Sequence, residues 1–237
     1  MKVLFSPKAN FLFAHFPKTA GTSLNTFLRE ALPDVRQVDP NDSHVSVPEV
    51  RRRLYYKDHP VRSALAKLLG RRVGRCDVVI PCPEELRMLG VVREPFEMCV
   101  SLFDYWHVKL PEHEKHHSVL ASAATNGDFK EFARLMAHDG RCLATYRDFF
   151  DLDGPFAPRT YLVDFAHLHD GLDQAFQAMG IKVDLGRLPA LNKNPCSDAK
   201  LRQREEEAGE LAGMIRERYR LGPGVRLYGA VSGQGGR

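Results

Sequence analysis

Apolar residues along the chain form either short continuous runs or longer runs with a helical period. The short runs, rich in Val, Leu and Phe, predict buried strands at residues 10–16, 76–80, 88–92 and 160–163. Segments in which apolar residues recur every three or four positions are predicted to be helices: 21–31, 47–54, 62–69, 95–106, 169–179 and 198–219. The alternation indicates an α/β fold with a central, mainly parallel sheet flanked by helices.

Other segments show neither period. Residues 107–127 are polar and His-rich, and we expect an irregular excursion over the edge of the sheet. The Gly-rich tail at residues 232–237 is expected to be disordered. We find no internal repeat and no linker, so residues 1–231 are predicted to form one domain, a length compatible with a single α/β unit.

Charge and cysteine usage narrow the class of protein. The net charge of +4 is too small to indicate a nucleic-acid partner, but it suits an anionic ligand held by a few lysines and arginines. The five cysteines form no Cys-x-x-Cys pair and lie near no histidine at metal-ligand spacing. We therefore expect no metal site, reduced thiols and a cytoplasmic location. No stretch approaches the roughly 20 apolar residues of a membrane span.

The first candidate site is the run Phe-Pro-Lys-Thr-Ala-Gly-Thr-Ser at residues 16–23, between a predicted strand and a predicted helix. Such a junction presents backbone N–H groups and the positive end of a helix dipole to an anion. Lys18 adds a charge, Thr22 and Ser23 add hydroxyls, and Gly21 lets the backbone approach a ligand. The run is not a Walker A loop, in which the lysine follows the glycine. A simpler interpretation is that Thr22 or Ser23 only caps the helix.

The second candidate site is Arg93, which follows the strand at 88–92 and precedes a helix that begins with Pro95. A guanidinium at the carboxyl edge of a parallel sheet lies where ligands of open α/β folds bind. It matches phosphate because its planar fork donates two charge-assisted hydrogen bonds. Ser101, eight positions later, can add a hydroxyl from the helix. The alternative is an ion pair of Arg93 with Glu94 or Glu97 on the surface.

Together the two motifs resemble those of sulfotransferases that use 3′-phosphoadenosine-5′-phosphosulfate (PAPS), particularly the bacterial and carbohydrate-acting branch. Residues 17–23 match its Pro-Lys-Thr-Ala-Gly-Thr-Ser loop, and Arg93 to Phe96 with Ser101 match its second motif. One departure is Met98, where that family usually has an arginine. The resemblance implies a P-loop-like fold, with Lys18, Thr19, Gly21, Thr22 and Ser23 on the 5′-phosphosulfate and Arg93 with Ser101 on the 3′-phosphate.

The implied reaction is in-line transfer of a sulfuryl group to an acceptor hydroxyl or amine, with a glycan or a small molecule as the acceptor. Adenosine 3′,5′-bisphosphate (PAP) would leave, and Lys18 would stabilise the charge on the leaving oxygen. His44, beside Asp42, is the first candidate for the general base and His107 is the second. Alternatively, Asp42 or Ser43 caps the following helix and His44 lies in an exposed loop.

Two other functions stay open at this point. A P-loop nucleotide kinase or NTPase is disfavoured because the chain has no Walker A loop and no acidic strand end to hold magnesium. A non-catalytic nucleotide-binding protein on the same fold is compatible with the motifs, because a fold does not fix a function. Thermal shifts with PAP, ADP and ATP plus magnesium would distinguish a sulfotransferase from a kinase or NTPase. Turnover of PAPS would distinguish it from a non-catalytic binding protein.

Overall fold

A computed structural model describes residues 3–38, 45–58, 85–109, 118–140, 142–189 and 197–229. Within these residues the strands form one six-stranded sheet in the order β3-β1-β2-β4-β5-β6. The bounds are β1 Leu4–Ser6, β2 Phe11–Ala14, β3 Arg36–Gln37, β4 Arg87–Val92, β5 Thr160–Asp164 and β6 Leu227–Tyr228. Strands β2, β4, β5 and β6 run parallel, whereas β1 is antiparallel to both β2 and β3. The protein is thus α/β with a mostly parallel sheet.

The register places the carboxyl ends of the parallel strands side by side. Ala14 of β2 pairs with Gly90 of β4, and Val92 of β4 pairs with Asp164 of β5. Loops that leave these three strands therefore meet at one edge of the sheet, which is the usual ligand edge of open α/β folds.

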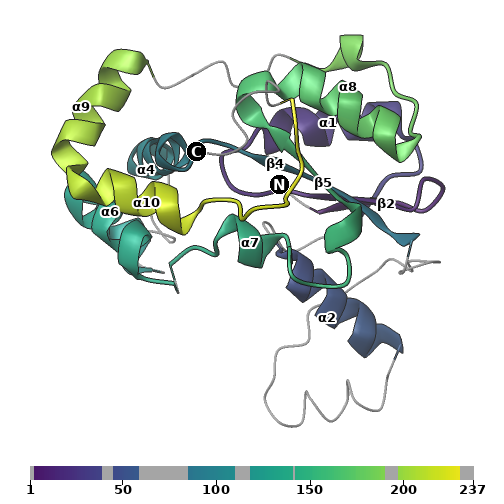
Figure 1. Ribbon diagram of the computed structural model, residues 1–237, viewed down its shortest axis with the longest axis horizontal. Coiled ribbons are helices and arrows are strands. Elements are labelled where there is room, and N and C mark those ends of the chain that lie inside the picture. Colours follow the sequence, from purple (N-terminus) through teal and green to yellow (C-terminus); the bar gives the residue numbers. More distant parts are fainter. Residues whose placement is uncertain are drawn as a thin grey trace.

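Helices cover both faces of the sheet (Figure 1). The bounds are α1 Gly21–Ala31, α2 Val47–Asp58, α4 Pro95–Lys109, α5 Val119–Thr125, α6 Phe129–His138, α7 Tyr146–Phe149, α8 Leu168–Met179, α9 Asp198–Ala208 and α10 Glu210–Arg218. Helices α1 and α8 lie on one face, and α4, α6, α7 and α10 pack on the other.

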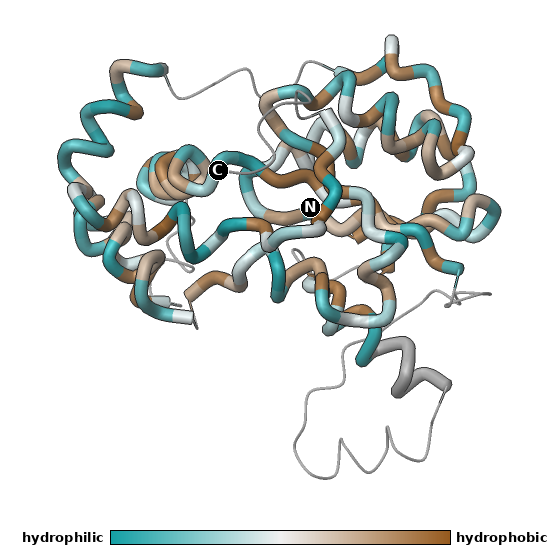
Figure 2. The backbone as a smooth tube through the Cα atoms, in the orientation of Figure 1, coloured by the Kyte–Doolittle hydropathy of each residue, from teal (hydrophilic) through white to brown (hydrophobic). Residues whose placement is uncertain are grey.

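The side-chain alternation of the strands divides the core between these two layers. In β2, Leu12 and Ala14 belong to the cluster with α4, α6 and α10, whereas Phe11 and Phe13 belong to the cluster with α1 and α8. Figure 2 shows hydrophobic strands at the centre and the hydrophilic helix α9 at the periphery. Because both faces are covered, the parallel strands read as continuous apolar runs rather than as alternating ones.

Several sequence-based predictions are confirmed. Strands at 10–16, 88–92 and 160–163 correspond to β2, β4 and β5, and the helices at 21–31, 47–54, 95–106 and 169–179 correspond to α1, α2, α4 and α8. Helix α8 ends at Gly180, which takes the left-handed conformation (φ 67°) typical of a helix end. The predicted strand 76–80, the helix 62–69 and the tail 232–237 lie outside the described residues.

Two predictions were wrong in part. The single helix expected at 198–219 is two helices, because Gly209 (φ 57°, ψ −130°) breaks it between α9 and α10. The irregular excursion expected at 107–127 is helical at both of its described ends, where α4 continues to Lys109 and α5 occupies Val119–Thr125. Helix α5 forms because Ser118 caps it, its hydroxyl oxygen accepting a hydrogen bond from the Ala121 N–H.

None of the helices in the described part of the chain is long and apolar enough to cross a membrane.

Candidate anion site at the carboxyl edge of the sheet

The loop between β2 and α1 has an unusual backbone. Lys18 (φ 64°) and Ala20 (φ 59°) both occupy the left-handed region, which side-chain-bearing residues rarely adopt, and Thr19 between them does not. Turns of this kind direct successive N–H groups into a concavity that suits an anion. Ala20 is also the N-cap of α1 and supplies no side-chain oxygen to the helix. The loop therefore differs from an ordinary capped helix start, and its left-handed residues are compatible with anion binding.

Thr19 closes this loop from within. Its side chain is buried, and its hydroxyl donates a hydrogen bond of 2.8 Å to the Phe16 carbonyl oxygen. Thr19 was predicted to bind the ligand, and this geometry leaves its backbone N–H rather than its hydroxyl for that role.

Gly21 is required by a close neighbour within the protein. A Cβ atom at this position would lie 1.7 Å from Cδ2 of His15, so the imidazole ring lies directly against the Gly21 backbone. His15 is only 1% exposed. The glycine thus makes room for His15 within the protein. The approach of a ligand to Gly21, expected from the sequence, stays a prediction.

Arg93 lies immediately after β4, at the same edge of the sheet. Its side chain is 6% exposed, its Nε donates to Glu97 Oε2 at 3.2 Å, and its Cζ lies 4.7 Å from the centre of the Phe165 ring. Among the described residues, neither terminal nitrogen of the guanidinium has a hydrogen-bond partner. A buried arginine whose terminal N–H groups bond to none of the described residues suits an anion that binds through two oxygens.

The strand–helix junction around Arg93 is fixed by its neighbour Glu94. One carboxylate oxygen of Glu94 accepts the Glu97 N–H at 2.6 Å, and the other accepts Nε of Arg216 at 2.8 Å. Arg216 belongs to α10 and also donates to Glu205 of α9 at 2.6 Å. Met98, where the resembled family has an arginine, is buried in the core, and Arg216 provides the cation for Glu94.

Lys18 projects toward α4. Its ammonium lies 4.2 Å from the centre of the Tyr105 ring, and Tyr105 is 42% exposed. Burial, then the nearby charges of Arg93 and Lys109, lower the pKa of Lys18, while Asp104 acts in the opposite direction. A lysine that is partly desolvated beside two other cations gains when an anion binds, because the anion neutralises their repulsion.

One face of α4 connects the two cations. Glu97, Ser101 and Tyr105 follow one another at intervals of four residues and so share a face of the helix. Glu97 contacts Arg93 and Tyr105 contacts Lys18, so Ser101 lies between the contact points of the two cations. Along the helix axis, roughly 12 Å separates Glu97 from Tyr105. The site thus offers two cation positions rather than one.

The structure brings together most of the predicted site residues: Lys18, Thr19, Gly21, Thr22, Ser23, Arg93 and Ser101. Thr22 and Ser23 stand in the first turn of α1. His44 lies outside the described residues. His107 is about a third of a helical turn from the face of Ser101, and its Nδ1–H donates to the Ala124 carbonyl oxygen at 2.9 Å. This bond joins α4 to α5, and the role of His107 as a general base stays a prediction.

Three residues complete the site without having been predicted as part of it: Tyr146, Phe165 and Arg216. The ion pair of Arg93 with Glu97 was the alternative drawn from the sequence, and it is present, although Arg93 is buried rather than on the surface. Phe165 follows β5, so the rule that parallel strands end at one edge could have identified it. Tyr146 and Arg216 reach the site from distant parts of the chain, and no local pattern marks them.

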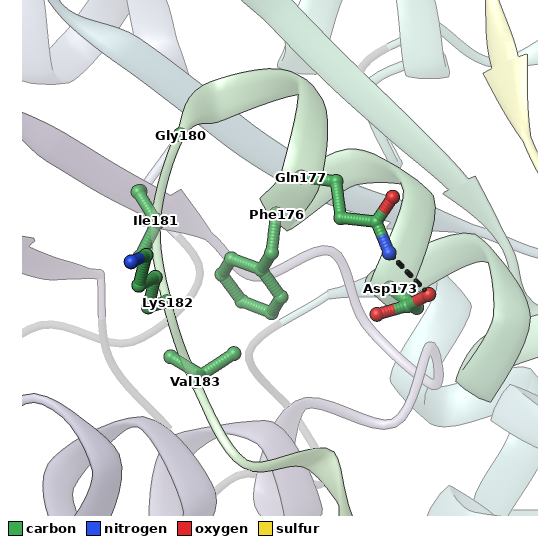
Figure 3. A pocket seen from close by; sticks show the side chains of 7 residues that line it. All are labelled: Asp173, Phe176, Gln177, Gly180, Ile181, Lys182 and Val183. Carbon is green, nitrogen blue, oxygen red and sulfur yellow. Dashed lines mark hydrogen bonds between the residues drawn. The ribbon is translucent and has the colours of Figure 1, made fainter.

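A shallow pocket also occurs at the other edge of the sheet. It is lined by Asp173, Phe176, Gln177, Gly180, Ile181, Lys182 and Val183 (Figure 3). The Met179 carbonyl oxygen beside it accepts a hydrogen bond from Arg87, the first residue of β4, which places the pocket at the amino edge. Its Asp173 carboxylate is engaged by the Gln177 amide at 2.7 Å. The pocket is thus remote from Lys18 and Arg93.

No group of three or more potential metal-ligating side chains occurs in the described ranges of the chain. No protein-family model, no curated protein and no solved structure matches the chain.

Proposed function

We propose that the protein is a PAPS-dependent sulfotransferase with a P-loop-like fold, which transfers a sulfuryl group to an acceptor hydroxyl or amine, possible acceptors being glycans and small molecules. The strand–loop–helix unit of β2 and α1 and the adjacent parallel strand β4 are the elements that such a fold needs. The donor would bind across the carboxyl ends of β2 and β4.

The observation that carries this proposal is the pairing of Lys18 and Arg93 at one edge of the sheet, with Ser101 between their contacts on α4. A nucleotide with phosphate groups at two separate positions, such as PAP, can engage both cations at once. A nucleotide with one 5′-phosphate supplies no second phosphate to the terminal nitrogens of Arg93, whose Nε is paired with Glu97. The site therefore favours a 3′,5′-bisphosphate over a 5′-monophosphate.

Within this proposal Lys18 supports the chemical step. The acceptor oxygen or nitrogen attacks sulfur, the bond from sulfur to the bridging oxygen of the 5′-phosphate breaks, and PAP leaves with the charge on that oxygen. An ammonium beside that oxygen stabilises the transition state more than the ground state, which raises kcat. The acceptor proton passes to a general base, which we assign to His44.

Incubation with ³⁵S-labelled PAPS and a panel of glycans, phenols, lipids and peptides tests the proposal. We expect label transfer to one acceptor class in the wild type, strongly reduced turnover in Lys18→Ala at saturating donor, and weakened donor binding in Arg93→Ala. Thermal shifts with PAP, ADP and ATP plus magnesium distinguish the kinase alternative from a sulfotransferase, because at equal concentration the more tightly bound ligand stabilises the native state more.

Arg134→Ala is a matched control for the loss of one positive charge, since Arg134 is on α6 and pairs with Glu131 at the surface. It should leave donor binding and turnover unchanged. Full activity of Lys18→Ala at saturating PAPS would contradict the assigned chemistry, and a larger shift with ATP and magnesium than with PAP would favour a kinase.

A further inference from the structure

The side chain of Tyr146 contacts both anion loops. This residue is in the short helix α7 and is 1% exposed. Its ring packs edge-on against the ring of Phe16, the first residue of the Lys18 loop, with 4.6 Å between the ring centres. Its hydroxyl donates to the Arg93 carbonyl oxygen at 2.8 Å and accepts the Arg93 N–H at 3.2 Å. The Tyr146 side chain thus contacts both the Arg93 backbone and the ring of Phe16, at the start of the Lys18 loop.

These contacts constrain the position of Arg93 through its backbone. Within the described residues, the carboxylate that pairs with the Arg93 side chain is that of Glu97, which belongs to α4. The two bonds from Tyr146 instead fix the backbone, from which the guanidinium extends. Burial raises the pKa of the Tyr146 phenol well above its usual value, so the hydroxyl keeps its proton at any physiological pH. Support of this kind holds a binding group in its productive geometry before the ligand arrives.

We propose that Tyr146 is a positioning residue that holds Arg93 at a fixed distance from the Lys18 loop and so sets the preference for ligands with two separated anionic groups. The identity of the preferred ligand as PAP rests on the proposed function, whereas the placement of Arg93 by Tyr146 does not. In this arrangement Tyr146 touches no ligand and acts through the backbone of Arg93.

The test compares Tyr146→Phe with a matched variant, Tyr219→Phe. The first keeps the ring against Phe16 and removes both hydrogen bonds to Arg93. Tyr219 is equally buried, and its hydroxyl donates to the Leu143 carbonyl oxygen at 3.1 Å. Its ring packs edge-on against the Tyr146 ring, with 5.9 Å between the ring centres, and phenylalanine keeps that ring. Each variant thus loses a buried tyrosine hydroxyl, but only one loses contacts with the anion site.

Calorimetry with PAP, adenosine 5′-phosphate and inorganic phosphate measures a change in ligand preference, which general destabilisation would not produce. For Tyr146→Phe, which loses both hydrogen bonds to the Arg93 backbone, we expect PAP affinity to fall about tenfold. Adenosine 5′-phosphate, which we place on the Lys18 loop alone, should change less than about twofold. Tyr219→Phe should retain both affinities even if its melting temperature falls.

Inorganic phosphate keeps the test independent of the donor. Arg93→Ala and Tyr146→Phe should each weaken phosphate binding, and the double variant should be little weaker than Arg93→Ala, because both changes act on one group. If wild-type protein binds PAP no better than adenosine 5′-phosphate but this phosphate pattern holds, the proposed function is wrong and the positioning role stands. The role is overturned if Tyr146→Phe binds phosphate like wild type, if Tyr219→Phe loses as much, or if Arg93→Ala loses nothing.

Discussion

Replacing Gly21 with alanine tests how the anion loop is built. The backbone of Gly21 is not left-handed, so alanine meets no backbone strain there, and at an ordinary helical position it would stabilise by about 0.5–1 kcal/mol. The obstacle is His15: the new methyl group would lie 1.7 Å from Cδ2, where carbon atoms prefer about 3.5–4.0 Å. The ring must move by roughly 2 Å in a packed interior, and such overpacking costs about 1–3 kcal/mol. We expect a net destabilisation of about 1–2 kcal/mol.

Urea unfolding, followed by the fluorescence of the single tryptophan, Trp106, measures this change. The Gly21→Ala change is measured both in the wild type and in His15→Ala, which removes the ring. In His15→Ala the Gly21→Ala change should be neutral or stabilising, and the difference between the two backgrounds is the energy of the clash. The same loss in both backgrounds, or no loss in the wild type, would refute this account of Gly21. Ala20→Gly is the neighbouring control and should stabilise by up to about 1 kcal/mol, because glycine accepts the left-handed conformation of Ala20 (φ 59°) without strain.

Three further results are expected. As the pH rises, Lys18 loses its proton and PAP affinity should fall. Because the pKa of Lys18 lies below its ordinary value of 10.5, this fall should begin at a lower pH than with an ordinary lysine, and Lys18→Arg should extend binding to higher pH. Between the lowered pKa of Lys18 and its ordinary value of 10.5, the unfolded state binds more protons than the native state. Folding stability should therefore rise with pH in this range, as equilibrium unfolding would show. Arg216→Gln should lower the free energy of unfolding by less than about 1 kcal/mol, and less still at high salt, because Arg216 and its carboxylate partners are partly exposed. His44→Gln should lower kcat about a hundredfold with unchanged PAP affinity, whereas wild-type kcat would remove His44 from the mechanism.

The sequence predicted the parts of the fold that have a strong period. The helices after β2, β4 and β5 were predicted because each buries one apolar stripe against the sheet. Strands β3 and β6 have two residues each, too few for any periodic signal. Helix α6 does carry a helical pattern in Phe129, Phe132, Ala133 and Met136, all of them buried, and could have been predicted.

The break at Gly209 illustrates the limit of periodicity. Ala208, Leu211, Ala212, Ile215 and Tyr219 were expected to share one face of a continuous helix, and most of them do enter one core cluster. The pattern of apolar positions does not reveal that the backbone angles change at Gly209. That change depends on how both helices pack.

The candidate site was predictable where it depends on chain order. Lys18 and Arg93 each follow a parallel strand, and the meeting of strand ends at one edge brings them together. The ion pair of Arg93 with Glu97 was one of the alternatives drawn from the sequence. The contacts of Tyr146 and Arg216 were not predictable, because these residues lie 53 and 122 positions away from the residues that they bond. Such contacts arise from packing of the layers, and no motif in one segment encodes them.

The central claim is that Lys18 and Arg93 bind the two phosphate groups of one nucleotide. Titration calorimetry of PAP and adenosine 5′-phosphate, on the wild type and on Arg93→Ala, tests it most directly. We expect the wild type to bind PAP at least about tenfold more tightly than adenosine 5′-phosphate, because only PAP supplies a second phosphate to the terminal nitrogens of the buried guanidinium. In Arg93→Ala this advantage should disappear while the affinity for adenosine 5′-phosphate is retained. Equal affinities of the wild type for the two nucleotides would contradict the claim.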